Sequence, residues 1–154
     1  MGASGRIEAV CIGERKGEPK RPVASITVVA EHGVAGDAHA GSERQVSLLA
    51  RESLDKLRAK GLAVGPGDLA ENMTTSGITL CALPVGTRLR VGGAVLEVTQ
   101  IGKECHEPCA IAREAGECVM PTEGIFARVR GGGEVRPGDA VEVADEDQGG
   151  DPDG

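Results

Sequence analysis

Short apolar runs separated by glycine and proline turns recur along this chain, and their spacing predicts a mainly β fold. Leu89 and Val91 alternate with Arg88 and Arg90, which is the period-2 pattern of a strand with one buried face. Gly92-Gly93 follows this run and predicts a hairpin turn. Runs of this kind predict strands at Arg6–Gly13, Ala24–Ala30, Thr87–Val91, Ala94–Gln100, Gly124–Arg130 and Ala140–Val143, and Gln45–Leu49 is a further short apolar run.

Helical patterns are few. Leu54 and Leu57 lie three apart among charged residues, which predicts a short amphipathic helix over Ala50–Lys60 with Gly61 as its C-cap. Cys109–Ala115 is long enough for one or two helical turns. We therefore expect a mainly β, small barrel-like domain over residues 1–144 with one or two short helices, followed by an acidic, glycine-rich and disordered tail over residues 145–154.

Composition narrows the function classes. The 154 residues include one Phe and no Trp or Tyr, so the core must be aliphatic. A net charge of -7 and the lack of aromatic stacking platforms argue against nucleic-acid binding. The sequence has no apolar run near the ~20 residues of a membrane span and no secretory leader pattern, so we expect a cytoplasmic protein without membrane contact.

The residue types best suited to metal or sulfur chemistry are concentrated in residues 102–129. Three of the five cysteines, Cys105, Cys109 and Cys118, occur here beside His106, and soft sulfur ligands in one segment indicate metal or sulfur chemistry. Their C-x3-C-x8-C spacing differs from the paired C-x2-C of structural zinc sites. Cys118 lies in a loop bounded by glycine and proline, where a thiol is accessible. The alternative for each cysteine is a small buried side chain, and this is the expectation for Cys11 and Cys81.

Two polar segments are further candidates. His39 lies in G-D-A-H-A-G, where small neighbours offer little packing and let a ligand approach the backbone. The run over residues 71–77, E-N-M-T-T-S-G, offers amide and hydroxyl groups to a heterocyclic or phosphorylated ligand. Its alternative is a capping and turn segment, because these residue types commonly form turns.

These stretches together resemble the MOSC family, the domain at the C-terminus of molybdenum cofactor sulfurases that also occurs as free-standing bacterial proteins. The resemblance covers roughly Arg6 to Val143 and rests on several motifs in order. They are G-V-A-G-D-A-H-A-G at residues 33–41, R-Q-V-S-L-L at 44–49, G-D-L-A-E-N-M-T-T-S-G at 67–77, G-T-R-L-R-V-G-G-A-V-L-E-V-T-Q-I-G-K at 86–103, C-H-E-P-C at 105–109, G-E-C-V-M-P-T-E-G-I-F-A-R-V at 116–129 and R-P-G-D-A-V-E-V at 136–143.

The resemblance implies a β-barrel-like fold and a tie to the molybdenum cofactor, with Cys118 as the family cysteine that carries a persulfide or binds the metal. Cys105 and Cys109 are further candidates for metal binding. We expect a molybdopterin-type cofactor or its precursor to bind between the His39 loop, the Asn72–Thr75 run and the cysteine segment. The expected cofactor-binding residues are His39, Arg44, Asn72, Thr74, Thr75, Lys103 and Arg128.

The resemblance also implies partners. The chain lacks a desulfurase domain, so no pyridoxal phosphate is expected, and sulfur would come from a separate cysteine desulfurase and pass to a molybdoenzyme client. Whether the protein is an enzyme stays open; as one it would be sulfurtransferase-like or dependent on the molybdenum cofactor. Two alternatives remain: a small zinc-binding or structural β module, and a molybdenum-dependent reductase subunit that needs an external electron donor.

Overall fold

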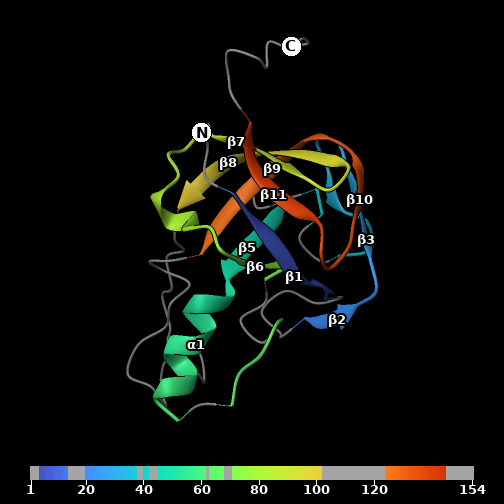
Figure 1. Ribbon diagram of the computed structural model, residues 1–154. Coiled ribbons are helices and arrows are strands. Elements are labelled where there is room, and N and C mark those ends of the chain that lie inside the picture. Colours follow the sequence, from blue (N-terminus) through green and yellow to red (C-terminus); the bar gives the residue numbers. More distant parts are fainter. Residues whose placement is uncertain are drawn as a thin grey trace.

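The computed structural model describes residues 4–13, 20–37, 40–41, 45–61, 63–67, 71–101 and 124–144. Its strands are β1 (Ser4–Ile12), β2 (Arg21–Val23), β3 (Ile26–Val29), β4 (Gly33–Val34), β5 (Val46–Ala50), β6 (Met73–Ser76), β7 (Arg88–Val91), β8 (Ala94–Ile101), β9 (Ile125–Gly131), β10 (Gly133–Val135) and β11 (Ala140–Ala144). One α-helix, α1 (Arg51–Ala59), and one 3-10 helix, η1 (Leu80–Ala82), complete the described elements (Figure 1).

The larger sheet closes into a β-barrel. Its strands follow the order β11-β7-β8-β9-β5-β6-β1-β2, and an additional pairing of β11 with β1 closes a ring that leaves β2 outside. All pairs in the ring are antiparallel except β5 with β6, which run parallel. A smaller sheet, ordered β10-β3-β4, lies beside the barrel (Figure 1). The expectation of a mainly β, barrel-like fold is confirmed.

The barrel interior is filled by aliphatic side chains that alternate along the strands. Leu89 and Val91 of β7, Leu96 and Val98 of β8, and Val129 of β9 are fully buried and belong to one core cluster. Every member of that cluster is Ala, Val, Leu, Ile or Met, as the composition predicts. Phe126 is buried but lies outside the cluster, because the inward positions of β9 are its neighbours Ile125 and Ala127. A small barrel is thus closed around side chains rather than around a channel.

Most predicted elements agree with the structure to within two residues. The predicted hairpin is present, with Val91 paired to Ala94 across Gly92-Gly93. The predicted helix is α1; Leu54 and Leu57 are buried beneath it, and Gly61 ends it by donating from its N–H to the Arg58 carbonyl at 2.9 Å. The predicted turn at Cys109–Ala115 and the tail over residues 145–154 lie outside the described residues.

The sequence interpretation was wrong about the local structure of one segment. Residues 73–76, part of the polar run for which a capping and turn segment was the alternative, form β6, and all four side chains are buried. The pattern misleads because both faces of this strand are covered, so polar and apolar positions do not alternate. β2, β4 and β10 were also not predicted as separate strands, and each is only two or three residues long.

The packed interior gives a direct test. We expect Leu96→Ala to lower the free energy of unfolding by about 2–5 kcal/mol, because a fully buried leucine leaves a cavity between strands that cannot collapse. Val85, which is 61% exposed, supplies the control: Val85→Ala should change stability by less than about 0.5 kcal/mol. Urea unfolding of both variants measures the difference, and equal losses would contradict the assigned interior.

Candidate functional site

A buried polar network surrounds Asn72, the residue before β6. Asn72 Oδ1 accepts from the Ser47 N–H at 3.1 Å, and its Nδ2 donates to the Cys11 carbonyl at 3.1 Å and to Asp37 Oδ1 at 3.1 Å. Its own N–H donates to Ser47 Oγ at 3.0 Å. Asn72 therefore joins the end of β1, the start of β5 and the turn that contains Asp37.

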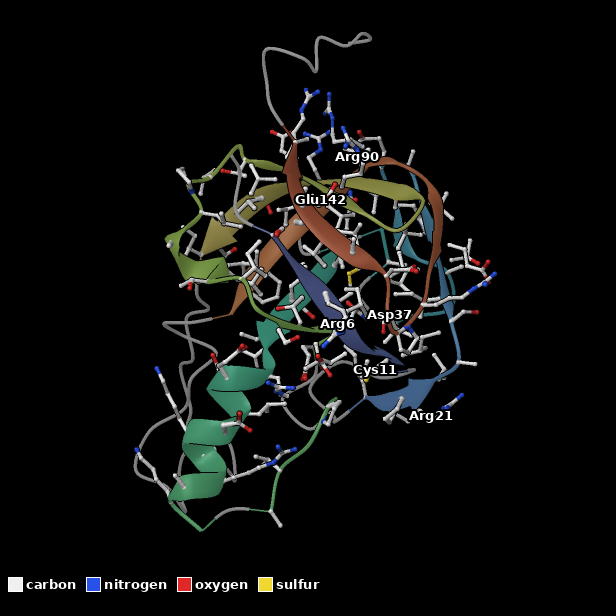
Figure 2. The ribbon with its side chains drawn as sticks, viewed as in Figure 1. Arg6, Cys11, Arg21, Asp37, Arg90 and Glu142 are labelled. Carbon is white, nitrogen blue, oxygen red and sulfur yellow. The ribbon has the colours of Figure 1, made fainter. Side chains whose placement is uncertain are left out.

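An ion pair lies at the centre of this network. Lys20 Nζ is 2.9 Å from Asp37 Oδ1, and both side chains are 0% exposed. The Gly13 N–H also donates to Asp37 Oδ1, at 2.9 Å. Figure 2 shows Asp37 and Cys11 on the side of the molecule where β1 ends. Buried charges carry a high desolvation cost, so such a pair is kept only where several donors surround the carboxylate.

Glu71 extends the network to the turn at residues 65–67. Its Oε2 accepts from the Gly67 N–H at 3.0 Å and from Thr74 Oγ1 at 2.8 Å, and the side chain is fully buried. Gly67 has φ +89, and a Cβ there would lie 2.2 Å from the Lys20 carbonyl oxygen. Only glycine fits this close approach, which places Lys20 against the 65–67 turn.

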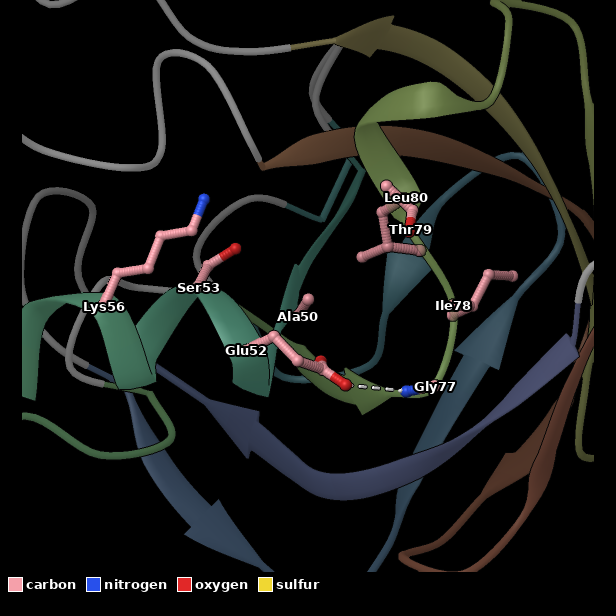
Figure 3. A pocket seen from close by; sticks show the side chains of 8 residues that line it. All are labelled: Ala50, Glu52, Ser53, Lys56, Gly77, Ile78, Thr79 and Leu80. Atoms are coloured by element: carbon pink, nitrogen blue, oxygen red, sulfur yellow. Dashed lines mark hydrogen bonds between the residues drawn. The ribbon is translucent and has the colours of Figure 1, made fainter.

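A cavity of about 460 Å³ lies where β5 and β6 end and α1 begins (Figure 3). Its described walls come from two segments, residues 50–56 and residues 77–80. Glu52 Oε2 bridges them by accepting from the Gly77 N–H at 3.0 Å. The described lining residues are Ala50, Glu52, Ser53, Lys56, Gly77, Ile78, Thr79 and Leu80.

The cysteine-containing segment is attached to the barrel at this same end. Ile101, the last residue of β8, pairs with Ile125, the first residue of β9, and Ile125 also pairs with Leu48. Leu48 is two residues before Ala50, which lines the cavity. Both ends of the chain between Ile101 and Ile125, which contains Cys105, Cys109 and Cys118, are therefore tied close to the cavity end of the barrel.

Four of the predicted cofactor-binding residues are described, and none of them lines this cavity. Asn72 and Thr74 are buried in the polar network, and Thr75 is buried in β6. Thr75 pairs with Ile7 and Ala50 and points into the barrel like Met73, two positions earlier. Within the described part of the chain, Thr75 Oγ1 has no hydrogen-bond partner, so a buried hydroxyl without a partner lies beside the cavity residue Ala50.

Arg128 lies on the outer face of β9, in line with Phe126 rather than with the inward Ala127 and Val129. Its guanidinium donates to Glu31 Oε1 through Nε at 3.1 Å and also through Nη2. The hydrogen bond and charge of Glu31 raise the pKa of Arg128 above its ordinary value. A ligand that uses this cation would have to compete with Glu31.

The remaining predicted site residues, His39, Arg44, Lys103, Cys105, Cys109 and Cys118, lie outside the described residues. In the part of the chain that is described, no group of three His, Cys, Asp or Glu side chains is placed to hold a metal ion. The metal assignment of the cysteines stays a prediction. Cys11 is fully buried, as expected.

Sequence reasoning missed the ion pair itself. Asp37 stands in the quoted G-D-A-H-A-G motif, so its position was a usable signal. Lys20 lies in a charged, proline-containing stretch that was interpreted as a loop, and a buried lysine there has no sequence signature. Only the fold shows that the two side chains meet.

The comparison with protein families now identifies the domain. The family model of the MOSC domain matches residues 35–142. This chain belongs to the MOSC domain family. MOSC domains are linked to the functions of molybdenum cofactor sulfurases and related proteins, and the matched range contains all ten predicted site residues.

Solved MOSC-like structures support the fold. The YuaD protein from Bacillus subtilis has a TM-score of 0.76 at 20% identity, with 93% of this chain and 97% of that chain covered. YiiM from Geobacillus stearothermophilus has a TM-score of 0.67 at 21% identity, with 94% of this chain and 77% of that chain covered. YiiM from Escherichia coli has a TM-score of 0.63 at 21% identity, with 91% of this chain and 70% of that chain covered. At these identities the likeness concerns the fold.

No curated protein matches this MOSC chain significantly. None of the helices in the described residues is long and apolar enough to span a membrane.

The network predicts that replacing Asn72 destabilises the fold. Asn72→Ala removes buried hydrogen bonds to Ser47, Cys11 and Asp37, so we expect the free energy of unfolding to fall by about 2–4 kcal/mol. Thr79→Ala, at an exposed position, serves as the control and should change it by less than about 0.5 kcal/mol. Guanidinium unfolding checks both; an Asn72→Ala variant as stable as wild type would show that the network contributes nothing to the fold.

Proposed function

We propose that this MOSC protein binds a molybdopterin-type cofactor at the cavity end of the barrel, with Cys118 as sulfur carrier or metal ligand. The observation that carries the proposal is the convergence at one barrel end. The cavity opens between α1 and the connection from β6 to η1, and Ile101 and Ile125 tie the cysteine-containing segment to the same end. Family membership supplies the link to the molybdenum cofactor.

The cavity suits such a group in size and chemistry. Its volume of about 460 Å³ lies within the usual range for small-molecule sites. Ala50, Ile78 and Leu80 offer an apolar wall for a flat heterocycle. Lys56 and the first turn of α1, which no side chain of the described residues caps, favour a phosphate. Glu52 is the acidic member of the described lining, and its bond to Gly77 occupies Oε2.

The Thr75 hydroxyl, which has no hydrogen-bond partner among the described residues, supports the same location. It lies in β6 beside Ala50, on the side of the sheet that faces the barrel interior. A buried hydroxyl without a partner costs free energy until it finds a hydrogen bond. A ligand atom or an ordered water that reaches this hydroxyl would supply one, so Thr75 stays a proposed cofactor-binding residue.

The proposed role of Cys118 follows from thiolate chemistry. Its sulfur would attack the terminal sulfur of a donor persulfide, and the donor would leave as a thiolate, so one sulfur atom moves without net oxidation. A cysteine desulfurase is the proposed donor and a molybdoenzyme the proposed recipient. When bound, the cofactor would supply a metal for which a thiolate is a suitable soft ligand.

His39, Arg44 and Lys103 remain proposed ligand contacts, and we propose that the cations of Arg44 and Lys103 pair with the cofactor phosphate. Cys105 and Cys109 remain proposed metal ligands or resolving thiols. Arg128 would bind the ligand only after its hydrogen bonds to Glu31 break, because two of its guanidinium nitrogens already donate to Glu31.

Blocking the cavity tests the proposal. The chain contains no Trp or Tyr, so a single tryptophan both fills space and reports binding. Thr79→Trp places an indole at an exposed position in the cavity wall and should weaken binding of cofactor released from a purified molybdoenzyme by about tenfold or more.

Val85→Trp is the matched control, because Val85 is exposed and does not line the cavity. Fluorescence titration should give wild-type affinity for this variant. Equal affinities for both tryptophan variants would exclude the cavity as the binding site. Stoichiometric zinc with no pterin binding by the wild-type protein would favour the zinc module instead.

A further inference from the structure

We propose that Glu52 determines the ligand specificity of the cavity by recognising a ring edge with two adjacent N–H donors, an inference that rests on the function proposed above. The ring chemistry is that of an amino-oxopyrimidine, in which a ring N–H lies beside an exocyclic amino group. Pterins and guanine share this edge. The motifs on which the family resemblance rests do not include Glu52.

The Glu52 carboxylate lines the cavity without a counter-charge among the described residues. Its one hydrogen bond within that part of the chain comes from the Gly77 N–H at 3.0 Å. Lys56 lies four positions along α1, where glutamate and lysine commonly pair, yet Figure 3 shows the two side chains pointing apart. Asp55, by contrast, pairs with Arg58 at 3.1 Å. The cavity therefore keeps one carboxylate that no described cation neutralises.

A backbone donor holds this carboxylate in place. Oε2 of Glu52 accepts from Gly77, whose φ of +81 is a conformation that favours glycine. Oε1 has no donor among the described residues. The two oxygens of a carboxylate offer about four lone-pair sites, so both oxygens of Glu52 still have room for a donor. Glu52 thus presents the cavity with an edge of two acceptors.

The neighbouring walls suit the faces of a flat ring. Ala50, Ile78 and Leu80 line the same cavity with apolar side chains, so the faces of a heterocycle would pack on them and its polar edge would meet Glu52. Two adjacent N–H groups match two carboxylate oxygens through parallel hydrogen bonds, as a guanidinium does. A carbonyl in place of the amino group would set two acceptor oxygens against each other, which disfavours binding.

A pair of ligands isolates the amino group. Pterin and lumazine differ in that an amino group of pterin is a carbonyl in lumazine. Both are fluorescent, and the chain has no Trp or Tyr whose emission would interfere. Guanosine carries the same donor edge on a purine, so its competition with pterin distinguishes a guanine nucleoside from a pterin as the source of the ring.

Two variants isolate the carboxylate. Glu52→Gln keeps the shape of the side chain but replaces one acceptor oxygen with an amide donor. Asp55→Asn is the matched control, because it makes the same change of charge on α1 at an exposed residue outside the described lining. Glu52 is also exposed and makes one hydrogen bond, so we expect both variants to melt close to wild type.

Fluorescence titration of wild-type protein should show pterin bound about tenfold or more tightly than lumazine. The preference should vanish in Glu52→Gln and persist in Asp55→Asn. Displacement of pterin by guanosine at lower concentration than by unlabelled pterin would support the ring chemistry with a guanine nucleoside as its source. Absence of pterin binding, equal affinity of wild-type protein for pterin and lumazine, or a preference that survives in Glu52→Gln would overturn the inference.

Cofactor released from a purified molybdoenzyme separates this role of Glu52 from the function proposed above. If the pterin preference depends on Glu52 but wild-type protein does not bind the cofactor, the proposed function fails and recognition of the ring stands. If the cofactor binds equally to wild-type protein and Glu52→Gln, and wild-type protein does not discriminate pterin from lumazine, the role of Glu52 fails and the proposed function stands.

Discussion

The barrel closes where β1 pairs with β11 along Ser4–Arg6 and with β6 along Arg6–Val10, and this double pairing holds the rest of the structure in place. At the closure Gly5 lies so near β6 that a Cβ would stand 2.2 Å from the Ser76 carbonyl oxygen. Closure satisfies the backbone groups of both strands and removes two sheet edges. It also encloses an interior for the aliphatic side chains. This matters because the chain has one aromatic residue, so a few large aromatic rings cannot form its core.

Closure also fixes β6, the strand on which the candidate site depends. At its start, Asn72 joins β1, β5 and the Asp37 turn through side-chain hydrogen bonds. At its end, Gly77 donates to Glu52 across the cavity. Beside it, Ser76 donates to Glu8, and this hydrogen bond, aided by Arg51 and Arg6, lowers the pKa of Glu8 below its ordinary value. One four-residue strand therefore connects the buried network to the cavity.

The sequence predicts the fold well where strands have one buried and one exposed face. β7 and β8 show this alternation and were placed from it, together with their glycine hairpin. β6 was not, because its threonines and serine are buried on both faces and resemble a turn in composition. Here tertiary packing overrides the local pattern.

The candidate site was predictable in part. Asn72, Thr74 and Thr75 were singled out as polar groups in a motif, but the sequence could not show that the first two bond within the protein. The Lys20–Asp37 pair depends on contacts across 17 positions of the chain, and no local signal marks such a pair. The cavity likewise arises where α1 meets the end of β6, a junction that periodicity does not reveal.

Cys118 is the residue through which this MOSC protein is proposed to handle a molybdopterin-type cofactor. Native mass spectrometry of freshly isolated protein, compared with Cys118→Ala, tests it most directly, because one spectrum reports both bound cofactor and any added sulfur atom. The account predicts a cofactor-bound species, with an added sulfur or a metal linkage that disappears in Cys118→Ala. A wild-type spectrum with stoichiometric zinc, no pterin and no added sulfur would contradict it.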